Sequence, residues 1–171
     1  MSPIILTKTK TEKHPLSVNV TQAVEDRRWD NHLDSFDLEA WFAATLTHVP
    51  QVFQETEVSI LWSNDAHVRA LNHHYRQKNT PTNVLSFPVP KALFTEGAAV
   101  VYLGDIILSF ETIDSEAIRD RKPFAHHVMH LCVHGFLHLL GFDHETDNDA
   151  SAMEAVEIRA LQQFNVSNPY I

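Results

Sequence analysis

Histidines are concentrated in one short stretch of the chain, HHVMHLCVHGFLHLLGFDH, which covers residues 126–144 and holds six of the twelve histidines. Three of them, His130, His134 and His138, are spaced by four residues. On an α-helix each residue turns by about 100° and rises by about 1.5 Å, so neighbours in this row can share a metal ion, whereas the outer two lie about 12 Å apart along the axis. The helix alone leaves two candidate ligand pairs, His130 with His134 or His134 with His138.

The residues after His138 favour the second pair. Gly141 can adopt a positive φ at low cost, so it can end the helix and turn the chain back, which would bring His144 beside His138. HGFLHLLGFDH then has the spacing of the metzincin motif H-E-x-x-H-x-x-G-x-x-H. Three neutral imidazoles with a fourth position open are typical of a catalytic zinc site, so we predict one zinc ion bound by His134, His138 and His144. The alternative is a buried helix whose histidines are satisfied within the core.

Gly135 occupies the position of the metzincin glutamate, which in zinc peptidases is the general base. Glycine inside a helix costs about 1 kcal/mol relative to alanine, so it needs an explanation. Two are open: a close contact between helix and strand, or a site kept open for a bulky substrate. Either way the peptidase mechanism lacks its base. Asp143, next to the third ligand, is a candidate replacement, and the alternative is a role in the turn.

The remaining histidines receive lesser roles. We expect His130 to lie in the core or to orient one of the ligands from behind. His126 and His127 are expected to face solvent or to lie near the start of the helix, and neither receives a role in the site. His73 and His74 are adjacent on another predicted helix, and adjacent helical residues face different directions, so they do not predict a shared site.

The surrounding sequence predicts one α+β metalloenzyme domain over residues 1–171, with a mixed sheet of about four strands packed with helices. Alternation of apolar and polar residues indicates strands in IILTKT and LSVNVTQAV, and compact β-rich runs follow in EVSILWS, VLSFPVP and AAVVYLGDIILSF. Helical spacing indicates helices in DLEAWFAATLTHV, NDAHVRALNHHYRQ, the histidine stretch and SAMEAVEIRALQQF. The metal site thus falls on the long central helix and the turn after it.

Local signals mark several element ends. Ser63, Asn64 or Asp65 is expected to cap the second helix. SEAIRDRKPF is expected to lead into the long helix, and Ser151 with Glu154 fits a capping box for the last one. Prolines in VLSFPVP place that strand at an edge of the sheet. The last predicted strand is expected to bend at its glycine.

Bulk composition narrows the class of protein. The net charge of −9 argues against non-specific coating of nucleic acid, which depends on many Lys and Arg contacts to phosphates. It leaves room for an enzyme that acts on nucleic acid through a local site. One cysteine, Cys132, excludes an intramolecular disulfide and fits a reducing compartment. No signal peptide and no apolar run of membrane-spanning length are apparent, so we expect a cytoplasmic protein without a membrane partner.

Three segments, HGFLHLLGFDH, YRQKNTPTNVLSFP and YLGDIILS, together closely resemble the YbeY family of bacterial rRNA maturation factors. The resemblance runs from about residue 55 to 165. It implies a single-domain α+β metalloprotein that acts as a zinc-dependent endoribonuclease on single strands. It also implies roles in maturation of the 16S rRNA 3′ end and in ribosome quality control. Single-stranded rRNA, the small ribosomal subunit and its assembly proteins would then be the partners.

The resemblance carries over to individual residues. It implies His134, His138 and His144 as metal ligands and Arg76 as the functionally important arginine. A metal ion and an arginine are suited to stabilise the charge that grows on a phosphodiester during cleavage. From the residues alone, Arg76 is better explained as a solvated cation that complements the helix dipole, and it is the resemblance that favours the functional role. Ser86 is either a substrate contact or a plain strand residue. Phe142 and Asn79 stand where tyrosine and aspartate are common in the family.

Two other functions compete with an endoribonuclease. A peptidase-like zinc hydrolase is favoured by the histidine spacing and opposed by Gly135, whereas RNA brings its own nucleophile, the 2′-OH. A non-catalytic ribosome-assembly factor with a structural metal is favoured by the net charge of −9. A structural zinc site usually has four protein ligands. Asp143, Asp147 and Asp149 are the nearby candidates for a fourth.

Overall fold

The computed structural model describes residues 4–6, 17–50, 55–94 and 100–171, and its centre is a five-stranded sheet with the strand order β1-β2-β3-β5-β4. The strands are β1 (Ile4–Leu6), β2 (Ser17–Val24), β3 (Glu55–Ser63), β4 (Val84–Pro88) and β5 (Val101–Ser109). The three inner strands are parallel, and β1 and β4 run antiparallel to their neighbours at the two edges. The predicted α+β class, mixed sheet and edge position of β4 are confirmed. The sheet has one strand more than the four or so expected.

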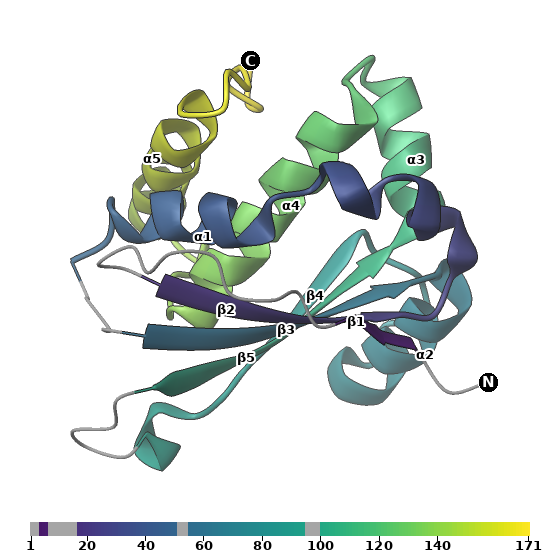
Figure 1. The fold of residues 1–171 in the computed structure, drawn as a ribbon, viewed down its shortest axis with the longest axis horizontal. Coiled ribbons are helices and arrows are strands. Elements are labelled where there is room, and N and C mark those ends of the chain that lie inside the picture. Colours follow the sequence, from purple (N-terminus) through teal and green to yellow (C-terminus); the bar gives the residue numbers. More distant parts are fainter. Residues whose placement is uncertain (1–3, 7–16, 51–54, 95–99) are drawn as a thin grey trace.

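The helices form two unequal layers on this sheet. They are α1 (Leu38–Leu46), α2 (Asp65–Arg76), α3 (Phe110–Arg119), α4 (Phe124–Leu139) and α5 (Asp147–Gln162), with 3₁₀ turns at Arg27–Asn31, Leu33–Ser35 and Lys91–Leu93. Figure 1 shows α1, α3, α4 and α5 on one side of the sheet and α2 on the other. None of the helices in the described ranges combines the length and the apolar character that crossing a bilayer requires.

α4 is the central helix and contacts α1, α3, α5, β4 and β5. It is apolar over most of its circumference because it is covered on several sides, as expected of a buried helix. Phe136 stacks on Phe42 of α1 with ring centroids 4.4 Å apart. Cys132 is fully buried beside them, and this burial raises the pKa of its thiol, which makes it an inert core residue. The helix that carries the histidines is therefore held rigidly.

The bend predicted in the last strand occurs within one continuous strand. Gly104 of β5 has φ +135°, and a Cβ there would lie 2.1 Å from the main-chain oxygen of Phe87 on β4. The register of β3 with β5 shifts opposite this point, between Glu57 and Val58. Glycine is required here because both the backbone angle and the close approach of β4 exclude a side chain.

The start of α5 differs from the prediction. The helix begins at Asp147 rather than near Ser151, and Thr146 is its N-cap. The Thr146 hydroxyl accepts from the amide of Asp149 at 3.2 Å and donates to the carboxylate of Asp149 at 2.6 Å. The capping box assigned to Ser151 and Glu154 is wrong, because α5 starts before these residues and Thr146 caps it.

Two further element ends can be compared with the sequence. Asn64 caps α2 by accepting from the amide of His67, which selects one of the three expected caps. SEAIRDRKPF does not lead continuously into the long helix: its first part completes α3, and α4 starts anew after Pro123. The break fits the positive φ of Arg121 and the exclusion of helical geometry before proline. Of the predicted strand IILTKT, residues 7–9 lie outside the described residues.

Candidate metal centre

His134 and His138 lie one turn apart on the same side of α4, as their spacing predicts. Their Nε2 atoms are 3.1 Å apart and their ring centroids 4.7 Å apart. His144 completes the group, with its ring centroid 5.1 Å from that of His138 and 5.7 Å from that of His134. One nitrogen atom of each of the three rings lies within 4.8 Å of the other two, a grouping that could hold a metal ion.

The turn after α4 brings His144 to this position. Gly141 has φ +94°, the conformation expected of a glycine that ends a helix. Its amide bonds to the carbonyl of His138, and the amide of Phe142 bonds to the carbonyl of Leu137, both at 3.0 Å. These two bonds satisfy carbonyl groups that the helix end would leave free, so the chain reverses at low cost and returns the third histidine.

The hydrogen bonds of the Nδ1 atoms of His134 and His138 determine that the Nε2 atoms face the centre of the group. His134 Nδ1 lies 2.7 Å from Oε1 of Glu157, and His138 Nδ1 lies 3.0 Å from the main-chain oxygen of Phe142. A carbonyl and an ionised carboxylate only accept hydrogen bonds, so each Nδ1 carries the hydrogen. In the neutral rings both Nε2 atoms then present lone pairs.

Two lone pairs facing each other at 3.1 Å repel unless a cation lies between them. Burial lowers the pKa of His138, and the neighbouring His134 lowers it further, so this ring is neutral at pH 7. Two nitrogen ligands of a tetrahedral zinc ion lie about 3.3 Å apart, which is close to the observed separation. The donor set of the three histidines therefore fits a metal ion.

Glu157 of α5 is the buried carboxylate behind His134, with 0% of its surface exposed. Burial by itself raises the pKa of this carboxyl, but hydrogen bonds from His130 and His134, the nearby His134 ring and the hydroxyl of Tyr170 lower it to about 2. The carboxylate is therefore ionised at neutral pH. A carboxylate that accepts a hydrogen bond from the ring nitrogen not used for the metal fixes the orientation of a metal-binding histidine and raises the basicity of the ring.

His130 lies outside the group of three and bonds to the same carboxylate, with its Nε2 3.0 Å from Oε2 of Glu157. It therefore contacts the carboxylate that also bonds to His134, and its supporting role stays a prediction. His130, His134 and Glu157 also form a group whose ligand atoms lie within 4.8 Å of one another. Hydrogen bonds already account for these contacts, so we assign the metal to the group with His138 and His144.

Gly135 lies where α4 crosses β4 and β5. A Cβ at this position would lie 3.0 Å from Oγ of Ser86 and 3.1 Å from Cγ2 of Ile106. Of the two explanations left open by the sequence, the close contact between helix and strand is the one supported. A glutamate here would be directed into the sheet. Ser86 meanwhile lies beneath α4, whereas its neighbours Leu85 and Phe87 pack in the cluster around α2.

The nearby aspartates do not complete the ligand set. Asp143 accepts from the amide of His144 at 2.8 Å, which is the turn role considered for it. Asp149 is engaged with Thr146 at the start of α5. Among the described side chains, none of Asp143, Asp147 and Asp149 belongs to a group within reach of a common metal ion. The three histidines thus leave a coordination position without a protein ligand.

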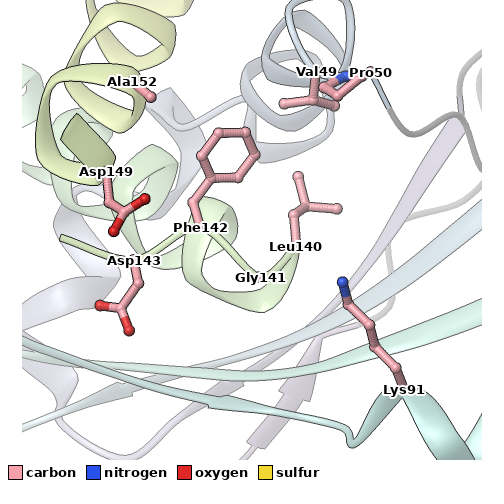
Figure 2. Close-up of a pocket in the computed structure, with 9 residues that line it drawn as sticks. All are labelled: Val49, Pro50, Lys91, Leu140, Gly141, Phe142, Asp143, Asp149 and Ala152. Carbon is pink, nitrogen blue, oxygen red and sulfur yellow. The ribbon is translucent and has the colours of Figure 1, made fainter. Parts of the chain in front are cut away.

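A cavity of about 410 Å³ adjoins the turn that carries His144. Its apolar wall is formed by Val49, Pro50, Leu140, Phe142 and Ala152, and its charged side chains are Lys91, Asp143 and Asp149. Figure 2 shows the ammonium group of Lys91 on one side of the cavity and the two carboxylates on the other, with the Phe142 ring between them. The space is large enough for a drug-sized or nucleotide-sized group beside the turn that leads to His144.

Arg76 is the last residue of α2, as predicted, and is exposed. α2 packs on the face of the sheet opposite α4, so Arg76 does not belong to the histidine group. The ring of the preceding Tyr75 lies 5.1 Å from that of Phe87 on β4, which places the end of α2 beside the edge strand. Within the described residues Arg76 forms no ion pair.

Two further polar residues line α4, and the sequence pattern did not single out the second. His127 lies near the start of α4, which is one of the two alternatives predicted for it, and it is buried rather than solvent-facing, with its Nε2 2.7 Å from Oε2 of Glu116 on α3. Glu157 was not singled out, although it lies beside Val156 and four residues after Met153 on the apolar side of α5. A carboxylate on the apolar side of an amphipathic helix was the available signal, because such a charge requires partners.

Comparisons with known proteins agree with the motif-based resemblance. The family model described as Endoribonuclease YbeY matches residues 23–165. A protein of Bradyrhizobium diazoefficiens named endoribonuclease YbeY is 42% identical over 95% of this chain and 91% of its own length. One of the same name from Dinoroseobacter shibae is 43% identical over 96% and 97%. A solution structure of a Thermotoga maritima protein shares the fold, with a TM-score of 0.52 at 18% identity over 86% of this chain and 91% of that one. The chain belongs to the endoribonuclease YbeY family.

Proposed function

We propose that the protein is a zinc-dependent endoribonuclease that cleaves single-stranded RNA and takes part in maturation of the 16S rRNA 3′ end and in ribosome quality control. The observation that carries the proposal is the pair of facing Nε2 atoms of His134 and His138, 3.1 Å apart, with His144 beside them and no fourth protein ligand among the described groups. Membership of the family supports RNA as the substrate. One zinc ion per chain, held by the three histidines, fits this donor set.

Zinc, when bound, supplies a Lewis acid that stabilises the charge developing on a phosphoryl oxygen. The chain's own contribution is to hold the three imidazoles. Glu157 orients His134, and the main-chain oxygen of Phe142 orients His138. Preorganised groups of this kind cost no rearrangement when the substrate reacts.

Arg76 is proposed to bind the phosphate backbone of the same RNA strand. It is exposed at the end of α2, beside the edge strand β4, and has no ion-pair partner among the described residues. Ser86 of β4 lies beneath α4. An RNA strand that follows the edge of the sheet along β4 would therefore pass between Arg76 and the histidines. An unpaired guanidinium is suited to this role because it binds phosphate through two parallel hydrogen bonds.

The cavity beside the third ligand is proposed to receive a nucleotide next to the scissile phosphate. Its apolar wall offers a surface for a base, and Lys91 offers a cation for the adjoining phosphate. Recognition of single-stranded RNA typically combines such stacking and phosphate contacts. A local site of this kind is compatible with the net charge of −9, because it does not need a basic surface.

The two competing functions are less favoured. A peptidase would need a general base. In this chain the position of the zinc-peptidase glutamate is occupied by Gly135, which faces the sheet. A structural metal would need a fourth ligand, and the three candidate aspartates stand apart from the histidines. The proposed setting is the cytoplasm, with rRNA, the small ribosomal subunit and its assembly proteins as partners and no membrane.

The test is cleavage of a defined single-stranded RNA carrying the 16S rRNA 3′ end by highly purified, zinc-loaded protein. His138→Ala should abolish cleavage and Arg76→Ala should reduce it by about 10- to 1,000-fold, as expected for loss of a charge-stabilising contact. Arg27→Ala, which removes another exposed arginine, should leave it unchanged. Equal cleavage by all three variants and the parent would reject the proposal.

A further inference from the structure

We propose that Tyr170, near the C-terminus, is a positioning residue of the metal centre that acts on His134 through Glu157. This inference rests on the metal centre proposed above but not on the substrate. Tyr170 lies on the segment that follows α5, and Figure 1 shows this end of the chain beside α5. It is therefore close to the histidines in space although it is 26 residues beyond the third of them.

The two oxygen atoms of Glu157 have different partners. Oε1 accepts from His134 Nδ1 at 2.7 Å. Oε2 accepts from His130 Nε2 at 3.0 Å and from the hydroxyl of Tyr170. Two donors converging on Oε2 fix the rotation of the carboxylate plane, and this rotation determines where Oε1 points. Tyr170 thus helps to hold the oxygen that orients His134.

The tyrosine itself is held in place. Its ring meets that of His130 edge to face, with centroids 5.5 Å apart and an angle of 84°. Its amide bonds to the side chain of Asn168 at 2.9 Å, and the ammonium group of Lys122 bonds to the carbonyl of Pro169 at 2.9 Å. The residue is 43% exposed, so it contributes little to the core, and its hydroxyl reaches the buried Glu157. A role in packing alone would not require that hydroxyl.

Removal of the hydroxyl should therefore affect the metal more than the fold. Glu157 would retain His130 as its only donor on Oε2, and the orientation of His134 would become less defined. Partners of metal ligands contribute about 10- to 100-fold to metal affinity. Tyr170 is one bond further out, so we expect Tyr170→Phe to weaken zinc binding by about 3- to 10-fold.

The experiment measures the zinc dissociation constant of the full chain by competition with a chromophoric chelator. Parallel measurements record the visible absorption of the cobalt-substituted protein and the melting temperature of the metal-free protein. Tyr102→Phe is the matched control, because the Tyr102 hydroxyl also donates to a carboxylate, that of Asp105, at 2.8 Å. Tyr170→Phe should weaken zinc binding and shift the cobalt bands, whereas Tyr102→Phe should do neither.

A double variant separates the possible outcomes. In a Glu157→Gln background, Tyr170→Phe should cause a smaller change in zinc affinity than in the parent, because its effect passes through Glu157. Unchanged zinc affinity and cobalt spectrum in Tyr170→Phe would overturn the inference, whatever happens to the melting temperature. Failure of the parent protein itself to bind zinc would instead overturn the proposed metal centre.

Discussion

Two carboxylates flank α4, and each holds histidines of that helix. Glu116 of α3 lies 2.7 Å from Nε2 of His127, and Glu157 of α5 lies 2.7 Å from Nδ1 of His134. Both histidines are largely shielded from solvent and both pairs join two helices. Only the second pair, however, borders a group of nitrogens able to hold a metal ion.

The difference lies in which ring nitrogen the carboxylate occupies. Glu116 bonds to Nε2 of His127, and Nδ1 of His127 is enclosed without a hydrogen-bond partner in the described structure. Glu157 bonds to Nδ1 of His134, so Nε2 of His134 faces His138. Glu116 also accepts from the side chain of Asn83, which ties the start of β4 to α3. A buried carboxylate–histidine pair is thus a metal support in one case and a structural link in the other.

The sharpest way to test this comparison is to remove one histidine from each region. His138→Ala should weaken zinc binding by more than about 100-fold, because a site with two remaining imidazoles loses a direct ligand. His127→Ala should leave zinc affinity within about 2-fold while lowering the free energy of unfolding by about 1–3 kcal/mol, the cost of losing one hydrogen bond to a charged, partly buried carboxylate. Chelator competition and denaturant titration measure the two quantities. Similar zinc loss in both variants would contradict the distinction.

The Glu157 region should also give stability a particular pH dependence. Because the pKa of Glu157 is lowered from its ordinary 4.5 to about 2, the ionised form is favoured in the folded state. Its contribution, of the order of 3 kcal/mol, is fully present above about pH 4.5 and is lost as the pH falls through about 2. In metal-free protein, the difference in unfolding free energy between the parent and Glu157→Gln should shrink over this window. A constant difference would contradict the assignment.

Exchanging each carboxylate for its amide gives a smaller contrast. Glu157→Gln should weaken zinc binding by about 10- to 100-fold, because the charge behind His134 is lost while the shape is kept. Glu116→Gln should change zinc affinity by less than about 2-fold. The measurement is again chelator competition, and equal effects would show that both carboxylates act only through the rigidity of α4.

The smallest expected effect concerns Asn83. Asn83→Ala removes a hydrogen bond to Glu116 at 2.9 Å and one to the amide of Val84 at 2.7 Å. We expect a loss of about 1–2 kcal/mol in unfolding free energy with unchanged zinc affinity. A loss of zinc comparable to that of Glu157→Gln would extend the metal centre to this side of α4.

Much of the candidate site could be predicted from sequence because its parts are local. His134, His138, Gly141 and His144 lie within eleven residues, so helix periodicity and the glycine turn determine their arrangement. Glu157 could not be placed in this way, because its position behind His134 depends on how α5 packs against α4. The nitrogen atom that His134 presents was likewise unpredictable, since it is set by that packing.

The fold shows the same division. Strand patterns and the edge position of β4 follow from alternation and prolines, and the bend at Gly104 from a lone glycine. The start of α5 was misplaced because Thr146 and Ser151 offer equivalent caps, and the choice depends on where the chain leaves His144. The burial of His127 could not be predicted because it comes from α3, an element whose separate existence the sequence pattern did not indicate.

The turn at Gly141 has a consequence for the dynamics of the protein. The Phe142 peptide bonds in both directions: its amide pairs with the carbonyl of Leu137, and its carbonyl pairs with the ring of His138. Fraying of the last helical turn and displacement of His138 are therefore one event. Metal occupancy should suppress this local opening, so the hydrogen-exchange rate of the Phe142 amide becomes a site-specific measure of metal occupancy.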